Sequence, residues 1–399
     1  MLRFSPFQLF SMIIVMLASF TVPVTVAYNI GAIVAGFDAT PSQAGLIASA
    51  QSLGTAPAAF IASRLISRFA SRRMFIVGLA VLALGNLASA YASDIEKLAL
   101  FQFLGGIGTG IVISIIMGTA ARSAKPEMTY GFINSSFGVF IVALGFIMPP
   151  ILKAGGVHGI YLLYAAFALV GIVAAFFAPN SKAPTAQEAE AQIGEPADVS
   201  ERASRKQAKT IGWIALIGFG IFFFAQSGIG AFAERIGVAS EIPLQTIGQV
   251  FAVGGLLTIV GPLVAGWIGA RFGSTLPLFL IAVALGVTVF GLANMETPLS
   301  FYIAAPLFTL LPGILMPSFL GALAVIDPTG RSAAMQPAFA TLGAILGPVV
   351  GGLVVENFAF PGLGWFTIAV IFLGSLFMSA ATVGADRKRS QAIPEKTAM

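Results

Sequence analysis

Charge is scarce in this sequence of 399 residues, and so are the side chains that bind metals or act as nucleophiles. Only 9% of the residues are charged, 57% are hydrophobic, and the mean hydropathy is +0.95. The sequence has no cysteine and a single histidine, His158. Disulfides and thiolate metal sites are therefore excluded, and a histidine-based metal site is close to excluded. We expect no Ser-His-Asp triad, because His158 is predicted to lie at the outer surface.

These absences also narrow the class of protein. A chain with so little polar surface cannot cover a core of this size in water, so we interpret it as an integral membrane protein. No phosphate-binding loop ends in Gly-Lys-Ser or Gly-Lys-Thr, which argues against an ATP-driven pump. Acids, histidines and cysteines do not cluster within the apolar segments, which argues against a membrane-embedded enzyme. We expect no metal, no organic cofactor and no nucleic-acid partner, because the charge distribution described next accounts for the net charge of +5.

Long apolar runs dominate the chain. A helix needs roughly 20 apolar residues to cross about 30 Å of hydrocarbon. Twelve segments qualify: 7–34, 43–66, 74–93, 97–120, 129–151, 158–178, 211–233, 243–269, 275–294, 299–322, 332–355 and 361–383. If both termini are cytoplasmic, all but three of the 21 basic residues lie inside, the exceptions being Lys97, Lys153 and Arg235. The sequence thus predicts twelve spans with cytoplasmic termini.

The spans fall into two related groups. We expect a six-helix bundle over 1–178, a polar cytoplasmic linker over 179–210 that is part flexible and part helical, a second bundle over 211–385 and a cytoplasmic tail over 386–399. A basic hairpin, SRLISRFASRR at 63–73, has a counterpart, GWIGARFGS at 266–274, about 203 positions later. Gly110 aligns with Gly313 at that offset, whereas Asn134 with Gln336 and Gly145 with Gly347 align at 202. Such internal symmetry is typical of secondary transporters.

Three motifs resemble those of the major facilitator superfamily. The hairpin after span 2 keeps Leu65, Arg68, Arg72 and Arg73 of the signature Gly-x-Leu-Ala-Asp-Arg-x-Gly-Arg-Arg, with Ser67 in place of the aspartate. Span 4 has a glycine-rich pattern that starts with Gln102, where the family has arginine. Span 11 carries a helix-packing motif, Gly343, Gly347, Pro348, Gly351 and Gly352, similar to the span-5 motif of antiporters. The resemblance implies an all-α membrane protein of two pseudo-symmetric six-helix bundles.

The resemblance also implies a latch between the two halves at the cytoplasmic side. Its candidates are basic residues of the two hairpins together with an acid and a base before span 11, namely Arg68, Arg72, Arg73, Arg271, Asp327 and Arg331. The alternative is that the arginines only set topology and reach to lipid headgroups.

Polar side chains within the spans are the candidates for a substrate pathway. Amides are costly against lipid and should turn inward. The predicted pathway residues are Tyr28, Asn29, Gln51, Gln102, Asn134, Phe223, Gln226, Ser227, Met316 and Gln336. The alternative for each is an interhelical hydrogen bond or packing contact. Glu234 and Asp38 are the candidates for proton or cation coupling, with a surface pair of Glu234 and Arg235 as the alternative.

Together these features predict a secondary active transporter. We expect a monomer in the cell inner membrane that moves a small, weakly polar or amphipathic organic solute by alternating access. Efflux coupled to protons is the first expectation, because of the span-11 motif and the apolar cavity walls. Uptake of a small organic metabolite by a symporter or uniporter is the alternative, and a receptor or scaffold that does not transport is the alternative of another class.

Overall fold

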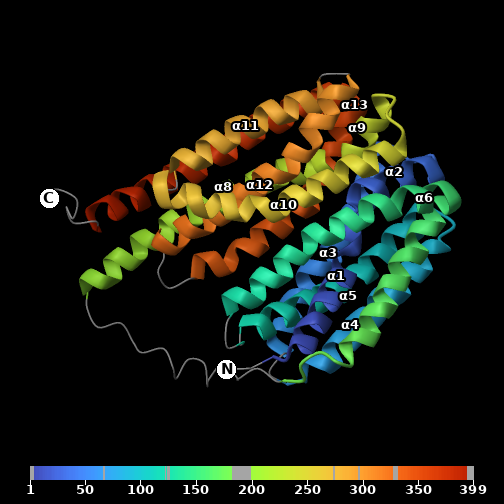
Figure 1. Ribbon diagram of the computed structural model, residues 1–399, viewed down its shortest axis with the longest axis horizontal. Coiled ribbons are helices and arrows are strands. Elements are labelled where there is room, and N and C mark those ends of the chain that lie inside the picture. The colour runs from blue at the N-terminus through green and yellow to red at the C-terminus, as the bar shows by residue number, and fades with distance from the viewer. Residues whose placement is uncertain are drawn as a thin grey trace.

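The computed structural model describes residues 4–65, 68–121, 123, 126–181, 199–272, 275–294, 297–326 and 331–392. These residues form long α-helices joined by short connections (Figure 1). The helices are α1 (Pro6–Val24), α2 (Val26–Phe37), α3 (Pro41–Leu65), α4 (Ser71–Ala90), α5 (Ile95–Ala121), α6 (Pro126–Ala175), α8 (Val199–Ala231), α9 (Ala233–Ala239), α10 (Leu244–Phe272), α11 (Thr275–Ala293), α12 (Pro298–Ile326) and α13 (Arg331–Ala392).

Ten of the described helices are long and apolar enough to cross a membrane. Two of these, α6 and α13, each hold two crossings, because the backbone leaves the helical conformation at Gly156 and at Ala359. The first crossing is broken between α1 and α2 at Thr25, and the seventh between α8 and α9 at Phe232. The prediction of twelve spans is thus confirmed, and the helices of eleven of them start within about three residues of the predicted positions.

The helix of the seventh span begins before the span itself, which covers Thr210–Ala231 and agrees with the predicted 211–233. Helix α8 begins at Val199, inside the segment 179–210 that we expected to be the linker. The helical part expected in that segment is therefore an extension of the span. Residues 182–198 of the predicted linker, and 393–399 of the predicted tail, lie outside the described residues.

The two halves repeat each other at a spacing of 203 residues. Helices α3 and α10 begin at 41 and 244, α5 and α12 begin at 95 and 298, and α4 and α11 end at 90 and 293. The described residues with positive φ form two pairs at the same spacing, Asp38 with Glu241 and Gly156 with Ala359. The repeat predicted from the basic hairpins therefore extends to the backbone of the connections.

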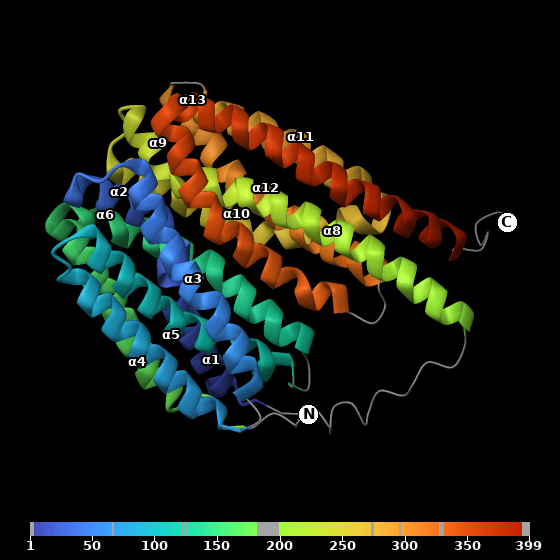
Figure 2. The ribbon, with the colours of Figure 1, turned by 180° about the vertical axis from the view of Figure 1, so that it is seen from behind.

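The halves meet at one end and diverge toward the other. Helices α1–α6 lie together, α8–α13 lie together, and the end near α2, α6 and α9 joins the two groups (Figures 1 and 2). The opposite end holds both termini, and we call it the inner end because the distribution of basic residues predicts that it is cytoplasmic. We call the joined end the outer end.

Close backbone contacts connect the halves on the side of the outer end. A Cβ atom on Gly45 of α3 would overlap the carbonyl oxygen of Pro348 in α13, and one on Gly248 of α10 would overlap that of Gly145 in α6. The two contacts are equivalent at a spacing of 203 residues, 45 with 248 and 145 with 348. The repeat thus aligns Gly145 with Pro348, and our alignment with Gly347 at an offset of 202 was wrong. Small residues at these positions allow the helices to approach closely.

Candidate solute pathway and coupling site

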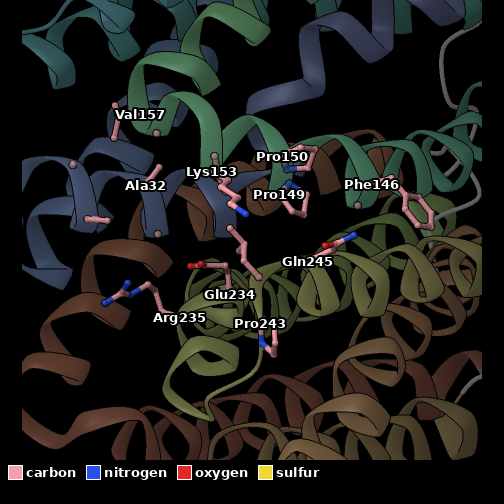
Figure 3. A pocket seen from close by; sticks show the side chains of 17 residues that line it. Ala32, Phe146, Pro149, Pro150, Lys153, Val157, Glu234, Arg235, Pro243 and Gln245 are labelled. Carbon is pink, nitrogen blue, oxygen red and sulfur yellow. The ribbon is translucent and has the colours of Figure 1, made fainter.

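A cavity of about 820 Å³ lies at the outer end of the molecule. Its walls come from α2 and α6 of the first half and from α9 and the start of α10 in the second half (Figure 3). The polar side chains of the lining are Lys153, Glu234, Arg235 and Gln245. We call this space the outer cavity.

A second, smaller cavity of about 140 Å³ lies deeper between the halves. Gly145 lines both cavities, so they adjoin at α6. The Tyr28 ring meets the Phe251 ring edge to face, with centroids 5.5 Å apart, and thereby joins α2 to α10 across the two halves. The lining is otherwise mostly apolar, with the hydroxyls of Thr25 and Thr309 as further polar groups. We call this space the inner cavity.

Glu234 stands at the border of these spaces. Among the described residues it has the one charged side chain that is buried, with 5% of its surface exposed. Its Oε2 has no hydrogen-bond partner, and the carboxyl group lies so close to α2 that a Cβ atom on Gly31 would overlap it. In Figure 3 the Lys153 amine points into the cavity, and the Arg235 side chain extends away from Glu234.

This geometry corrects one of our alternatives. Glu234 and Arg235 do not form a surface pair, because Glu234 is buried and the two side chains are not in ion-pair contact. The close packing of Glu234 depends on Gly31, which has no side chain to keep the carboxyl group away. Asp38, the other coupling candidate, is exposed at the end of α2 and is not part of the cavity lining.

The predicted pathway residues of the first half divide between several places. Tyr28 lines the inner cavity, and its hydroxyl has no hydrogen-bond partner. Asn29 is buried and lies near the hydroxyl of Tyr161 in α6, but neither group completes a hydrogen bond. Gln51 is buried in α3 with its Nε2 unpartnered. The side chain of Asn134 lies outside the described residues.

Gln102 does not join this group. Its Nε2 donates to Asn86 Oδ1 at 3.3 Å and to Ser89 Oγ at 2.9 Å, so the buried amide links α5 to α4 inside the first half. We therefore correct its predicted role, because the side chain makes the interhelical hydrogen bonds that were the alternative. A buried amide with partners is stable at such a position.

The polar residues of the second half also connect helices. Ser227 Oγ donates to the Gly343 carbonyl at 2.8 Å, and Gln336 Nε2 donates weakly to Met316 Sδ at 3.4 Å. Phe223 lies against Gly343, so it too contacts α13. Gln226 is half-buried on α8. Ser227 and Phe223 thus contact α13 at Gly343, and Met316 contacts it at Gln336.

A group of hydroxyls inside the first half was missed by the sequence analysis. Thr25 Oγ1 and Tyr164 OH are 2.6 Å apart, which fixes the break between α1 and α2 to α6. Tyr161 and Tyr164 meet edge to face. Their spacing of three residues, which puts both rings on one side of a helix, was the signal that could have identified them.

The span-11 glycines pack α13 against two other helices. Cβ atoms on Gly343, Gly347 and Gly351 would overlap or crowd α8, near Phe224, Ser227 and Gly228. Gly352 and the Pro348 carbonyl instead meet the start of α3 in the other half. The motif therefore joins α13 to its own half along one side and to the first half along another.

The inner end shows one contact of the predicted latch residues. Arg72 donates from Nη2 to the Ala178 carbonyl at 3.1 Å, which ties α4 to the end of the sixth crossing within one half. Arg68 and Arg73 are exposed. Asp327 and the side chains of Arg271 and Arg331 lie outside the described residues. In this conformation the Arg72 side chain therefore connects two helices of the first half, and among the described residues it makes no hydrogen bond with the second half.

Comparison with known proteins agrees with this architecture. Solved structures with the same fold include a bacterial homologue of the human lysosomal transporter Spinster in an inward-facing, unoccupied conformation (TM-score 0.73, 12% identity, covering 96% of this chain and 98% of that one) and a D-xylose-proton symporter (TM-score 0.72, 13% identity, 93% and 96%). A nucleoside transporter also has the same fold (TM-score 0.71, 13% identity, 95% and 99%). At these identities the likeness shows the fold alone.

Two sequence comparisons complete the picture. The chain is 30% identical over 97 residues to the 3-(3-hydroxy-phenyl)propionate transporter of Escherichia coli (strain K12), and this match spans 24% of each protein. Residues 6–336 match the family model described as Major Facilitator Superfamily. Since the match covers most of the chain, the protein belongs to the major facilitator superfamily and is a multi-pass membrane transporter, not an enzyme.

Proposed function

We propose that this transporter moves a small, weakly polar or amphipathic organic solute by alternating access, and that proton binding at Glu234 drives the movement. The observation that carries the proposal is the buried Glu234 carboxyl group at the seam between the halves, which is the only buried carboxyl group among the residues that the structure describes. A monomer in the cell inner membrane is part of the same proposal.

The proton-coupling step follows from the cost of burial. An ionised carboxylate without a hydrogen-bond partner is expensive in an apolar environment, so the protonated form favours the closed contact with α2. When Glu234 loses its proton, the carboxylate is stabilised better by water in a form whose outer end is open than by the apolar surroundings of the closed form. The charged or titratable groups near Glu234 are Tyr28 from α2 and Arg235 from its own helix, and Lys153 from α6 lines the same cavity. Protonation thus biases the contact between the halves.

The solute class follows from the inner cavity. Aromatic and aliphatic side chains line most of it, and no charged side chain lines it among the described residues. A space of this kind suits a solute with an apolar body and few polar groups. A relative that matches a quarter of this chain is named for 3-(3-hydroxy-phenyl)propionate, which is an aromatic amphipathic solute.

Efflux stays a prediction that rests on the span-11 motif. The glycines of that motif make packing contacts in α13, and these contacts are needed whichever way the solute moves. Uptake is the second candidate, favoured by the outer cavity, because Lys153 faces a space that opens at the outer end. The inner latch is also retained as a proposal: Arg68 and Arg73 are exposed where the halves diverge and can meet the second half when the inner end closes.

Flux in proteoliposomes tests the coupling proposal. Glu234→Gln should abolish accumulation or extrusion driven by a pH gradient, but it should leave solute exchange without a gradient intact, because the amide mimics the protonated carboxyl group. Glu241→Gln is the matched control, since Glu241 is exposed at the same outer end. Gradient-driven flux that survives in Glu234→Gln would exclude Glu234 as the coupling site. Absence of flux for every solute in the wild type would favour the receptor or scaffold.

A further inference from the structure

The outer cavity has an unusual balance of charge for a space inside a membrane transporter. Of the 17 residues that line it, Lys153 and Arg235 are cationic and Glu234 is acidic. Neither cation is in ion-pair contact with Glu234 among the described interactions. The cavity therefore holds separated charges of both signs, which the mostly apolar walls do not neutralise.

We infer that the outer cavity binds an amphipathic organic monoanion, a carboxylate on an apolar or aromatic body, and that it binds this anion together with a proton on Glu234. This inference deepens the proposed function: it rests on Glu234 as the proton site and names the class of solute and a docking place for it.

The sign of the charge selects an anion. With Glu234 ionised, the two cations and one acid leave the lining with one net positive charge, and with Glu234 protonated they leave two. An organic anion is therefore attracted in both states, and a cation is disfavoured in both. The Lys153 amine, which points into the cavity, is the natural partner for the carboxylate of the solute.

The remaining walls fit the body of such a solute. Phe146, Pro149 and Pro150 of α6 and Leu244 of α10 supply apolar surface, and the Gln245 amide of α10 lies on the same side of the cavity as Phe146 in Figure 3. A volume of about 820 Å³ lies within the range of pockets that hold small organic molecules. An apolar body can thus lie on α6 and α10 while its carboxylate meets Lys153.

The link between anion and proton comes from the unpartnered Glu234. Its Oε2 is buried without a hydrogen-bond partner, and the residue is part of the cavity lining. An ionised Glu234 repels a bound carboxylate, whereas a protonated one does not and can donate its hydrogen. The anion therefore favours the proton, and by reciprocity the proton favours the anion by the same factor. Because both arrive at the outer end, they move in the same direction, which makes uptake by symport the direction that this inference selects.

Binding to the purified full-length protein in nanodiscs tests the inference. Three probes share one body and differ in charge: 3-phenylpropionate, the neutral 3-phenylpropan-1-ol and the cationic 3-phenylpropan-1-amine. Calorimetry should detect 3-phenylpropionate in preference to the other two. Its affinity should fall as pH rises, at pH values where the carboxylate of the probe itself stays ionised.

Variants identify the side chains. Lys153→Gln should weaken 3-phenylpropionate about tenfold, the loss expected for one charge-assisted hydrogen bond, and Lys153→Arg should restore most of the affinity. Lys97→Gln is the matched control, because Lys97 is an exposed outer lysine that pairs with Asp94 outside the cavity. Glu234→Gln should remove the pH dependence of 3-phenylpropionate binding. Thermal unfolding of each variant shows whether the protein is folded.

Two results would overturn the inference: preferred binding of the amine, or equal affinities in Lys153→Gln and Lys97→Gln. These outcomes are separable from failure of the proposed function. Anion binding with the expected variant effects, but without any flux in proteoliposomes, would leave the cavity assignment standing and remove the transport proposal. Proton-driven flux that depends on Glu234, without anion binding, would support the transport proposal and remove the assignment of the outer cavity as an anion site.

Discussion

The contact between α3 and α13 predicts that one added methyl group shifts the balance between the two open forms of the transporter. In Gly45→Ala the new Cβ would overlap the Pro348 carbonyl oxygen and would lie 2.7 Å from its carbon and 3.1 Å from the nitrogen of Val349. These are backbone atoms, which cannot rotate aside as a side chain can. The parts of α3 and α13 that meet near the outer end must therefore separate.

The size of the shift follows from the cost of overpacking. An inserted methyl group in a well-packed contact costs about 1–3 kcal/mol. This cost applies only to the form that is closed at the outer end, whereas the helix preference for alanine over glycine applies to both forms equally. The ratio of outer-open to outer-closed molecules should therefore rise about 5- to 150-fold. Gly248→Ala, whose Cβ meets the Gly145 carbonyl, should have a similar effect because its contact is equivalent by the internal repeat.

The absence of cysteine makes the assay direct, since any introduced cysteine is the sole labelling site. Two pairs of exposed, repeat-related positions report on the two ends: Glu96→Cys with Leu299→Cys at the outer end, and Arg73→Cys with Leu276→Cys at the inner end. Spin-label distances should lengthen in the outer pair and shorten in the inner pair when Gly45 is replaced.

A matched glycine provides the control. Gly291 also lies within a helix, near the end of α11, but a Cβ there would make only an ordinary contact of 3.6 Å with Ala304. Gly291→Ala should leave both distance distributions unchanged. If Gly45→Ala gives the same distributions as Gly291→Ala, the contact does not hold the outer end closed, and the reasoning fails.

Three further predictions concern polar groups. Gln102→Leu should lower the stability against thermal unfolding by about 1 kcal/mol, because it removes a buried donor that serves two acceptors, and transport should survive; lost transport at normal stability would return Gln102 to the pathway. Glu356→Gln should weaken the 2.9 Å bond from Ser42 N and lengthen the outer spin-label distance slightly, and no change would show that this bond does not matter. Hydrogen bonds from Lys97 lower the pKa of Asp94 to about 2, so the stability that ionised Asp94 contributes is lost only as pH falls through that value. Asp94→Asn should therefore leave the pH profile of flux near neutrality unchanged, and a shifted profile would contradict this expectation.

The spans were predictable because the membrane makes each requirement local. A crossing helix must satisfy its own backbone and present apolar side chains over a fixed length, so the twelve runs in the sequence identify it without knowledge of its neighbours. The start of α8 at Val199 was missed because hydropathy detects only apolar residues. That extension is polar, so the apolar runs do not register it.

The candidate site was less predictable because it depends on partners far away in the sequence. Gln102 and Asn29 are both buried amides in outer halves of spans, yet one finds partners on α4 and the other finds none. Glu234 was a coupling candidate from the sequence, but its burial depends on Gly31, some two hundred residues earlier. The hydropathy pattern predicts how far along a membrane span a residue lies, but it does not predict which neighbouring helix its side chain contacts.

The repeat gives the contact between the halves a simple physical meaning. Two equivalent pairs, Gly45 with Pro348 and Gly145 with Gly248, place a carbonyl oxygen of one half against a glycine of the other. Because the pairs exchange under the 203-residue repeat, neither half is a fixed base on which the other moves, and the outer end closes through two similar contacts at once. Glu234 breaks this equivalence, since residue 31, its counterpart at the same spacing, is the glycine against which it packs. The Glu234 carboxyl group and the glycine that makes room for it therefore occupy equivalent positions in the two halves, so under the proposed function a change in protonation acts at the seam between them.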